Sequence, residues 1–160
     1  MTDRTSTRLE ELGIALPDPP RSEGYFLQSV ALGDLIFTSG QIASDGAAGL
    51  IATGKVGSDV DLDRAHACAR QCALNVVVQL RRELGTLDAI RRFVKVTIFV
   101  AAAPGFTKPH LAANGASELL AEVFEARGAH CRSAIAVAAL PLDSPVEVEA
   151  IAQFDPAART

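Results

Sequence analysis

Two apolar segments, residues 132–140 and 145–154, constrain the fold more than any other feature of the chain. They read RSAIAVAAL and PVEVEAIAQF, and the turn-forming sequence PLDS lies between them. Side chains alternate between the two faces of a strand, and in each segment both alternating sets contain alanine, valine or isoleucine. Neither segment therefore has the polar face of a sheet that is wetted on one side. We predict two strands of a sheet that is buried on both faces.

Two segments with helical periodicity are expected to cover one face of that sheet. Between residues 60 and 84 apolar side chains recur at three- and four-residue steps, and Gly85 follows as a C-terminal cap. A second helix is predicted from about residue 110 to residue 127, closed by Gly128. The strand FVKVTIFVA, residues 93–101, lies between them, and one of its faces is expected to carry Val94, Val96, Ile98 and Val100.

The N-terminal third of the chain predicts one short helix and several short strands. Residues 4–13 have a helical pattern that Gly13 ends, and the proline-rich ALPDPPRSEG follows as an extended connector. The segment YFLQSVALGDLIFTSGQI is interpreted as two strands with a turn at Gly33 and Asp34. LIATGKVG, residues 50–57, is expected to form a further short strand.

The order of these elements favours an α+β fold, with one mixed β-sheet and two long helices packed on one face. We expect a single domain over residues 1–160, in which residues 1–20 form the N-terminal helix and the connector. Because two helices cover only one face of a sheet, the other face is expected to lie against another subunit.

Composition argues against several classes of protein. Of the 160 residues, 49% are hydrophobic and 21% are charged, which is enough apolar material for a core and argues against global disorder. The net charge of −4 argues against binding of nucleic acid through a basic surface. No apolar run reaches the ~18 residues of a membrane span. The N-terminal residues lack the apolar region of a secretory signal, so we expect a cytoplasmic protein without membrane contact.

The cysteines and histidines do not predict a metal site. Cys68 and Cys72 lie one helical turn apart on the apolar stripe and are interpreted as small buried side chains. No second pair of cysteine or histidine residues follows at the spacing of zinc ligands. Cys131 is expected to have a structural packing role. His110 and His130 are isolated and have no evident partner in the sequence.

Isolated charges in the two apolar segments mark a candidate site. Arg132 begins the first segment, and Glu147 and Glu149 share one face of the second. A guanidinium beside a small apolar pocket can bind a carboxylate through two hydrogen bonds, and a carboxylate can hold and polarise a water molecule. We expect the two strands to be neighbours, and Arg132 and Glu147 together then predict hydrolysis of a small carboxylate-bearing molecule. The alternative is that Arg132 is an ordinary exposed arginine at a strand end.

Three segments of the chain together resemble the Rid/YjgF family, which is also known as endoribonuclease L-PSP. SVALGDLIFTSGQIASDG is similar to the family's N-terminal strand pair and its Ser-Gly-Gln signature, here residues 39–41. VVVQLRRELGTLDAIRRFVKVTIFVA resembles the central helix and the strand after it, and CRSAIAVAALPLDSPVEVEAIA resembles the C-terminal signature. The three occur in family order over roughly residues 25–154, and the N-terminal helix resembles a longer-chain subgroup.

The resemblance implies a chorismate-mutase-like fold and a homotrimer, with the sheets inside, the helices outside and the active sites between subunits. The implied activity is hydrolytic deamination of reactive enamine and imine intermediates, such as 2-aminoacrylate and its 2-imino acid tautomer, to a 2-keto acid and ammonia. The implied ligand is thus a small imino or enamino carboxylate. No metal or organic cofactor is implied.

Individual positions of the chain match the family's site residues. The resemblance implies that Arg132 grips the substrate carboxylate and that Glu147 orients the hydrolytic water. Gly40 matches the signature glycine, whose missing side chain leaves room for the ligand. Ala134 matches a position whose backbone contacts the substrate, and Asn114 corresponds to a polar residue of the pocket.

One position departs from the family and leaves other functions open. Where many members have a tyrosine, this chain has Phe26, with Tyr25 beside it, so the loss of a phenol hydroxyl is expected to change the substrate preference. Gly40 also fits a simple turn at a strand end. The alternatives are a non-catalytic protein that binds small carboxylates or another partner on the same trimeric scaffold, and a deaminase of a different imine. RNA cleavage is disfavoured by the acidic balance.

Overall fold

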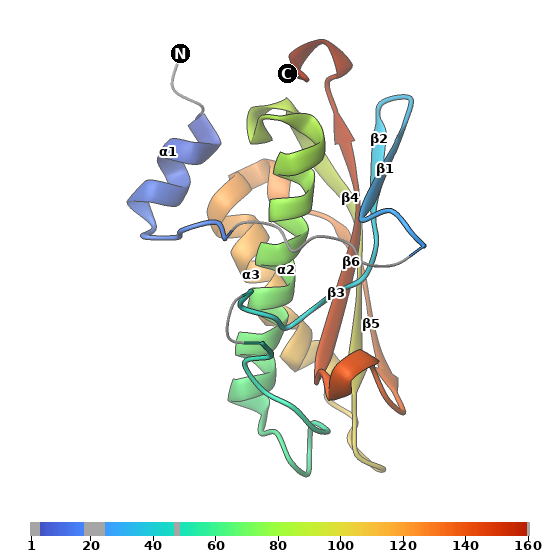
Figure 1. The fold of residues 1–160 in the computed structure, drawn as a ribbon. Coiled ribbons are helices and arrows are strands. Elements are labelled where there is room, and N and C mark those ends of the chain that lie inside the picture. Colours follow the sequence, from blue (N-terminus) through green and yellow to red (C-terminus); the bar gives the residue numbers. More distant parts are fainter. Residues whose placement is uncertain (1–3, 18–24, 47–48, 160) are drawn as a thin grey trace.

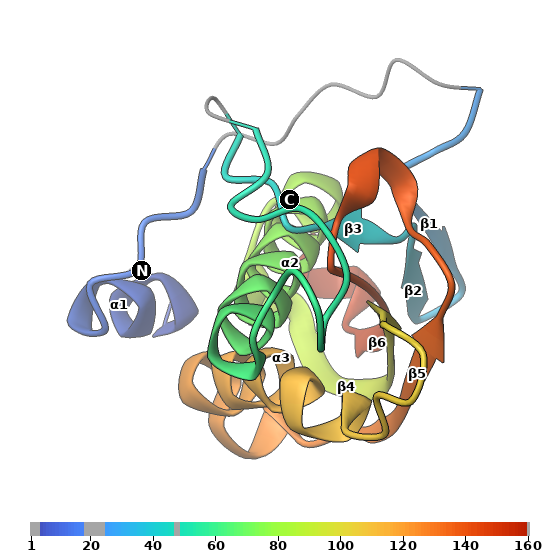
Figure 2. The ribbon, with the colours of Figure 1, turned by 90° about the horizontal axis from the view of Figure 1, so that it is seen from below.

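The computed structural model describes residues 4–17, 25–46 and 49–159. One mixed β-sheet forms a layer, and the two long helices α2 (Leu62–Leu84) and α3 (Pro109–Phe124) pack on one face of it (Figure 1). The shorter helix α1 (Arg4–Glu11) lies on the outer side of the helical layer, away from the sheet (Figure 2). This arrangement is the predicted α+β fold with two long helices on one face.

The sheet has the strand order β1-β2-β6-β4-β5, and the short strand β3 also pairs with β6. Among the described strands, β4 and β5 pair in parallel and the other pairs are antiparallel. β6 therefore lies in the centre of the sheet, and β5 lies at an edge. The strands are β1 (Ser29–Leu32), β2 (Leu35–Thr38), β3 (Gln41–Ile42), β4 (Ile90–Ala101), β5 (Cys131–Val137) and β6 (Val146–Phe154).

Helix α2 begins and ends at the residues that its sequence specifies. The side chain of Asp61 accepts a hydrogen bond from the backbone amide of Arg64 at 2.8 Å, which satisfies one of the free amides of the first turn. At the other end Gly85 adopts a φ of 78° and donates its amide to the carbonyl of Arg81. The apolar stripe between these caps is buried against the sheet and α3, as its periodicity predicts.

Helices α2 and α3 approach each other closely at Gly115. A Cβ built on Gly115 would lie 2.9 Å from the backbone carbonyl carbon of His66 and 3.2 Å from the amide nitrogen of Arg70. These neighbours are backbone atoms of α2, so a side chain at this position would force the two helices apart. After α3 the chain forms a 3-10 turn, Glu125–Gly128, which leads into β5.

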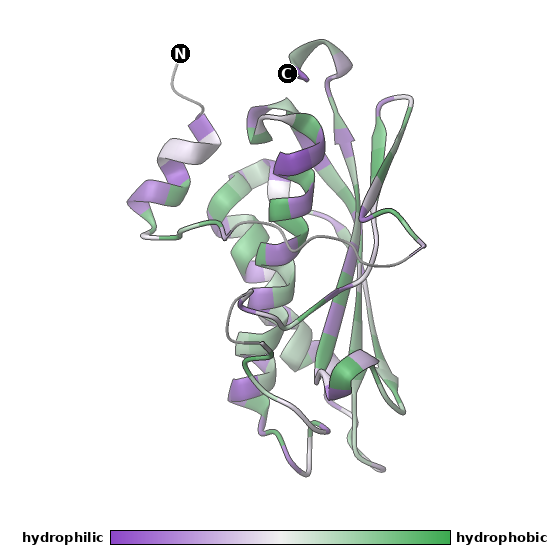
Figure 3. Cartoon of the chain, viewed as in Figure 1, coloured by the Kyte–Doolittle hydropathy of each residue, from purple (hydrophilic) through white to green (hydrophobic). Residues whose placement is uncertain are grey.

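Helix α1 is mostly hydrophilic, buries Leu9 in the core and makes polar contacts at its first turn (Figure 3). The Asp88 carboxylate, in the 3-10 turn Leu87–Ala89 before β4, accepts hydrogen bonds from the backbone amides of Arg4 (2.7 Å) and Thr5 (3.0 Å). It also accepts one from the Thr5 hydroxyl at 2.6 Å. Arg127 donates to the same hydroxyl at 2.9 Å. These bonds satisfy amides that a helix N-terminus leaves without partners.

Strand β4 departs from the expected alternation near its start. A β-bulge lies between Phe93 and Lys95 in the pairing with β6. Because the extra residue shifts the alternation, Phe93 is buried edge-to-face against Phe124, with ring centroids 5.0 Å apart, whereas Val94 is 38% exposed. The prediction that Val94 lies on the same face of the strand as Val96, Ile98 and Val100 is therefore wrong.

The strand expected over residues 50–57 does not form. Leu50 and Val56 make only isolated bridges, to Ser44 and to Val60 and Ala102. The glycines at 54 and 57 both have a positive φ, which interrupts an extended conformation.

The face of the sheet opposite the helices carries exposed hydrophobic side chains. Within the described residues, no further element covers this face of the single chain. The sequence prediction that another subunit lies against it stays a prediction. None of the helices in the described ranges is both long and apolar enough to cross a bilayer. The exposed side chains are Val30, Leu32, Phe37, Val94 and Ile135.

Candidate active site

A cavity of about 720 Å³ opens beside the first half of β6, where β3 leaves the end of β2. We call it the Glu147 cavity, because the carboxylate of Glu147 lines it. Its wall combines carboxylates, side-chain amides, hydroxyls and one phenyl ring. The lining residues are Phe26, Gln28, Thr38, Ser39, Gly40, Gln41, Ile42, Ser44, Asn75, Pro141, Glu147 and Glu149.

Gly40 gives Glu147 the space that its side chain occupies. A Cβ built on Gly40 would lie 2.7 Å from Cδ of Glu147 and 3.0 Å from its Cγ. Gly40 is not among the glycines with a positive φ, so the requirement for glycine is one of space and not of backbone conformation. The missing side chain was expected to leave room for a ligand. In the structure that room is filled by the Glu147 carboxylate itself.

Glu147 is a half-buried carboxylate without a protein donor. Burial, and secondly the charge of the neighbouring Glu149, raise the pKa of Glu147 above its usual value. In the part of the chain that the structure describes, no N–H or O–H group donates a hydrogen bond to this carboxylate. Its oxygens can therefore hold a water molecule and accept a proton from it.

An amide network shapes the wall next to Gly40. The Nε2 of Gln41 donates hydrogen bonds to Oε1 of Gln28 (2.9 Å) and to the carbonyl oxygen of Ser39 (3.1 Å). The hydroxyl of Ser39 donates to the carbonyl oxygen of Leu27 at 2.6 Å. These bonds hold the segment before β1 against the end of β2. They thereby place Phe26 in the lining of the cavity.

Helix α2 contributes two amides that the sequence analysis missed. The Nδ2 of Asn75 donates to the carbonyl oxygen of Ile42 at 3.0 Å, which fixes β3 against the helix. Gln79, one turn later, reaches Oε1 of Gln41 at 3.5 Å. The available signal is the four-residue spacing of Gln71, Asn75 and Gln79 within an otherwise apolar helix.

Arg132 begins the edge strand β5, and its guanidinium lies against α3. Nη1 donates to Oδ1 of Asn114 (2.9 Å) and to Oγ of Ser117 (3.2 Å), and Nη2 donates to the carbonyl oxygen of His110 (3.4 Å). The structure thus places Asn114 beside Arg132. Among the described residues Nε has no acceptor, and Nη2 keeps a second hydrogen. Nε and Nη2 form one edge of the guanidinium, which is suited to a carboxylate.

Arg132 and Glu147 do not meet within one chain. β4 lies between β5 and β6, so the expectation that the two strands are neighbours is wrong. Arg132 is paired with Val96 of β4 and Glu147 with Phe99, and an offset of three residues puts them on opposite faces. Strand spacing and rise place their Cα atoms roughly 10 Å apart across the sheet and roughly 10 Å along it. Ala134 is half-buried on the face of Arg132.

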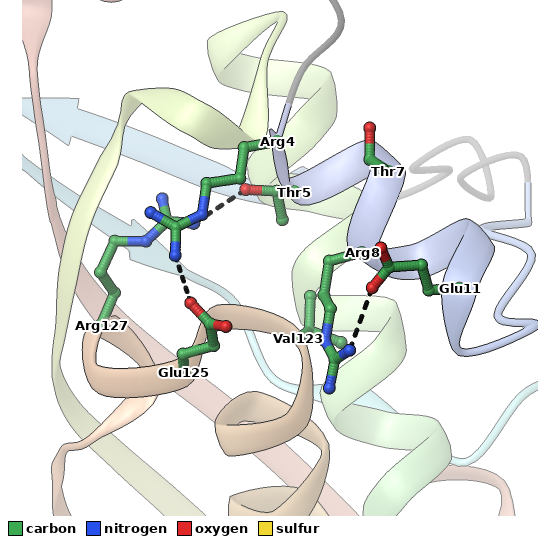
Figure 4. Close-up of a pocket in the computed structure, with 8 residues that line it drawn as sticks. All are labelled: Arg4, Thr5, Thr7, Arg8, Glu11, Val123, Glu125 and Arg127. Carbon is green, nitrogen blue, oxygen red and sulfur yellow. Dashed lines mark hydrogen bonds and ion pairs between the residues drawn. The ribbon is translucent and has the colours of Figure 1, made fainter.

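A second hollow, of about 280 Å³, lies between α1 and the end of α3 (Figure 4). Its charged side chains are bound to one another or to the backbone. Arg8 pairs with Glu11 at 3.1 Å and donates to the carbonyl oxygen of Glu122 at 3.0 Å, and Arg4 pairs with Glu125. These contacts fasten α1 to the body of the protein, so we assign this hollow a structural role.

The cysteines differ in environment. Cys68 and Cys72 are buried on α2, as predicted, and burial raises the pKa of Cys68 to about 11 and that of Cys72 well above its usual value. Cys131 is exposed, so the packing role expected for it is absent from the single chain. Within the described ranges, no three His, Cys, Asp or Glu side chains gather as ligands for a metal ion.

Comparisons with known proteins agree with the fold. Residues 17–154 match the sequence model of the family described as Endoribonuclease L-PSP. Protein TCP17 of Trypanosoma cruzi is 38% identical over 153 residues, which is 95% of each chain. The crystal structure of the protein Atu1372 of unknown function from Agrobacterium tumefaciens is 38% identical, with a TM-score of 0.88, and the match covers 95% of this chain and 93% of that one.

A more distant relative was solved with a ligand. The crystal structure of E. coli TdcF with bound serine is 28% identical and has a TM-score of 0.58, over 86% of this chain and 94% of that one. The match to Atu1372 covers 95% of this chain, whereas the match to TdcF covers 86% of it. The order of the strands, the Ser-Gly-Gln corner at residues 39–41 and the family match over residues 17–154 lead to one assignment. The chain belongs to the Endoribonuclease L-PSP family, which is also called the Rid/YjgF family.

Proposed function

We propose that this protein hydrolyses reactive 2-imino acids and their enamine tautomers to 2-keto acids and ammonia. The proposal depends above all on Glu147, a half-buried carboxylate that has a raised pKa and no donor among the described residues, at a cavity large enough for a small acid. Arg132 supplies a guanidinium edge for the substrate carboxylate. The serine bound to TdcF, a family relative, supports a small carboxylate ligand of this size.

The chemistry requires an anchored carboxylate, a positioned water and one group that moves a proton. With the substrate carboxylate on Arg132, the protonated imine carbon is the electrophile. Glu147 accepts a proton as the water oxygen bonds to this carbon, which gives a carbinolamine. The proton on Glu147 passes to the nitrogen, the C–N bond breaks as the carbonyl forms, and the hydroxyl proton of the carbinolamine passes to the departing ammonia. The products are the 2-keto acid and ammonium. The raised pKa makes the Glu147 carboxylate a stronger base for the first transfer, and it brings the group nearer to the working pH, where one residue can both accept and return a proton.

Both residues can serve one substrate only if two copies of the chain contribute. They lie on opposite faces of the sheet, with β4 between their strands, so Arg132 of one copy must face the Glu147 cavity of another. Two features favour such an assembly. Arg132 lies on an edge strand, and the open face of the sheet carries exposed Phe37 and Ile135. A closed ring of copies, such as the homotrimer implied by the sequence resemblance, repeats this contact.

The activity is tested by making the imine in place with an amino-acid oxidase or a serine dehydratase. Semicarbazide then traps the imine that remains, and its absorbance is followed with and without the protein. We expect the protein to lower the trapped fraction, and Arg132→Ala and Glu147→Gln to abolish this effect. Arg82→Ala, which removes an exposed charge on α2, is the matched control and should behave as the wild type. Full activity in Arg132→Ala would overturn the proposal.

The two-copy site has its own test. Arg132→Ala and Glu147→Gln chains are unfolded together, refolded together and assayed. If each site takes one residue from each of two chains, random mixing restores about a quarter of the wild-type sites. If both residues act within one chain, mixing restores none. Two inactive variants that stay inactive in the mixture would therefore disprove the shared site.

A binding protein on the same scaffold is the alternative outcome. It is supported if the wild type binds 2-keto acids through Arg132 but does not accelerate loss of the imine. RNA cleavage is the activity in the family's description. The described residues that line the Glu147 cavity include two glutamates and neither lysine nor arginine, which disfavours a phosphate backbone there. Incubation with RNA in rising salt checks this point directly.

A further inference from the structure

Ser117 and His130 form a hydrogen-bonded pair beside Arg132. Oγ of Ser117, on α3, lies 3.0 Å from Nε2 of His130, the residue just before β5. Nδ1 of His130 lies 2.7 Å from the carbonyl oxygen of Gly128, and Nη1 of Arg132 lies 3.2 Å from Oγ of Ser117. His130 has no evident partner in the sequence, and the structure shows that Ser117 is its partner. Ser117 and His130 are partly buried, and the exposed Arg132 is held against α3 by its hydrogen bonds.

The direction of each hydrogen bond in this group follows from two atoms at its ends, a carbonyl oxygen that can only accept and a guanidinium nitrogen that can only donate. A backbone carbonyl can only accept, so Nδ1 of His130 carries the proton that bonds Gly128. In the neutral ring Nε2 then has no proton and is an acceptor. A guanidinium can only donate, so Oγ of Ser117 accepts from Arg132 and is free to donate to Nε2. The chain therefore runs from Arg132 through Ser117 to His130 in one direction.

This directed chain decides how the guanidinium of Arg132 is turned. Nη1 gives its two hydrogens to Ser117 and Asn114, which fixes the plane of the group against α3. Among the described residues, this leaves the edge formed by Nε and Nη2 pointing away from these two partners. Without Ser117, the group would be held by Asn114 and by the longer bond of 3.4 Å from Nη2 to the carbonyl oxygen of His110. Ser117, held by His130, supplies a further fixed point. Aligned hydrogen bonds of this kind also strengthen one another.

We propose that Ser117 and His130 are positioning residues of the Arg132 site, which present the Nε–Nη2 edge to the carboxylate of the ligand. This inference rests on the proposed function only in taking that ligand to be a small 2-keto or 2-imino acid. Neither residue touches the reacting carbon. Their effect is on the affinity of Arg132 for a carboxylate, and His130 acts through Ser117.

The tautomer of His130 is a direct test that needs no activity. Two-bond ¹H–¹⁵N spectra of protein labelled at histidine, recorded at a pH where the ring is neutral, show which ring nitrogen carries the proton. We expect the Nδ1–H tautomer for His130, in contrast with the Nε2–H form that free histidine prefers. An Nε2–H tautomer would reverse the bond to Ser117 and overturn the inference.

Variants test the consequence for binding. We measure the dissociation constant of 2-oxobutanoate by calorimetry and the kcat and KM of imine hydrolysis. His130→Asn removes the neutral bond between Ser117 and His130, and Ser117→Ala removes this bond and the charge-assisted bond from Arg132. Each variant should therefore weaken binding about two- to tenfold, mainly through KM, with the larger effect in Ser117→Ala. Ser117→Thr keeps the hydroxyl and should restore affinity. The Ser117→Ala/His130→Asn double variant should bind no worse than Ser117→Ala alone, because His130 acts through Ser117.

A control separates this inference from the proposed function. His66→Asn removes a histidine of α2 that pairs with Glu118 and, among the described residues, makes no hydrogen bond to Arg132, Ser117 or His130, so it should leave the affinity unchanged. If Arg132→Ala itself binds 2-oxobutanoate normally, the proposed carboxylate site is wrong. If Arg132→Ala is defective but Ser117→Ala is not, the proposed site stands and the positioning role is refuted.

Discussion

The carboxylate of Glu147 occupies the space that a side chain at Gly40 would need. The two residues come from different strands, and β3 pairs with β6 at Ile42 and Glu147, which brings the corner before β3 over the glutamate. The glycine therefore controls the direction in which the carboxylate points. A methyl group added at a glycine can therefore act in two ways. It can turn a functional side chain and lower activity, or it can push two backbones apart and lower stability.

Gly40→Ala should damage activity more than stability. The added Cβ, 2.7 Å from Cδ of Glu147, meets the end of a side chain that can rotate away. The cost of an altered rotamer is about 0.5–1.5 kcal/mol, whereas turnover should fall by well over tenfold because the water-binding oxygens move. Urea unfolding and the imine assay measure the two effects. A variant with normal turnover would show that the direction of Glu147 does not matter.

Gly115→Ala is the matched contrast. Its Cβ would meet the backbone of α2 at His66, which cannot rotate away. We expect a loss of about 1–3 kcal/mol in the free energy of unfolding, as for other overpacked cores. The activity per folded molecule should fall less than in Gly40→Ala, because the added methyl group meets the backbone of α2 and not the Glu147 carboxylate. Equal losses of stability in the two glycine variants would contradict this distinction.

Glu149→Gln should move the pH dependence of the reaction. Burial and the charge of Glu149 both raise the pKa of Glu147, so removing that charge lowers it. The acid limb of kcat/KM, where Glu147 becomes protonated, is therefore expected to shift to lower pH. The shift should be partial, because burial is the larger cause and remains. A shift to higher pH, or none, would argue that Glu147 is not the group that titrates.

Glu147→Gln should stabilise the protein at neutral pH. The pKa of Glu147 is raised in the folded state, so the folded state binds this proton more tightly than the unfolded chain does. Its contribution is complete below the unfolded value, near 4.5, and is lost as the pH rises through the higher folded value. Glutamine is uncharged at every pH, so the variant does not lose this contribution to folding stability as the pH rises. The urea midpoint of the variant should exceed that of the wild type at pH 7, and the difference should shrink toward pH 4.

Asp88→Ala should release helix α1 without affecting the cavity. Asp88 accepts three hydrogen bonds from Arg4 and Thr5, and loss of such a cap costs about 0.5–2 kcal/mol. Faster hydrogen exchange over residues 4–11 is the expected result, with normal imine hydrolysis. Glu10→Ala, on the exposed side of the same helix, is the control. Unchanged exchange in Asp88→Ala would mean that other contacts hold the helix.

Local signals predicted the elements but not their order in the sheet. The caps and stripe of α2 act over a few residues, so Asp61 and Gly85 mark its ends directly. Strand order depends on contacts between distant segments. Consecutive strands are usually neighbours, which favours a place for β5 beside β6. In the structure β4 already occupies that place. The bulge after Phe93 also depends on contacts between distant segments, because it is a shift in the register between β4 and β6.

Contacts between distant segments also limit how much of the candidate site can be predicted from the sequence. Phe26, Gly40 and Glu147 were named from sequence and lie together in one cavity. Ser117 and His130 were not paired, because they lie 13 residues apart on different elements and meet only when β5 docks beside α3. Asn75 left a sequence signal, as an amide in an apolar helix. The side chains of Arg132 and Glu147 had the expected chemistry, but their opposite faces could not be read from alternation within each strand alone.

The central position of β6 has a consequence for synthesis on the ribosome. β6 emerges after β1, β2, β3, β4 and β5, yet it is the strand that joins β2 to β4. Until residues 146–154 are available, the β1–β2 hairpin and the β4–β5 pair are separate pieces with open edges, and part of the α2 surface has nothing to pack on. Open edges invite pairing with other chains. A nascent chain stopped before residue 146 should therefore depend on chaperones, and its fate as folded protein or as degraded peptide is decided late in translation.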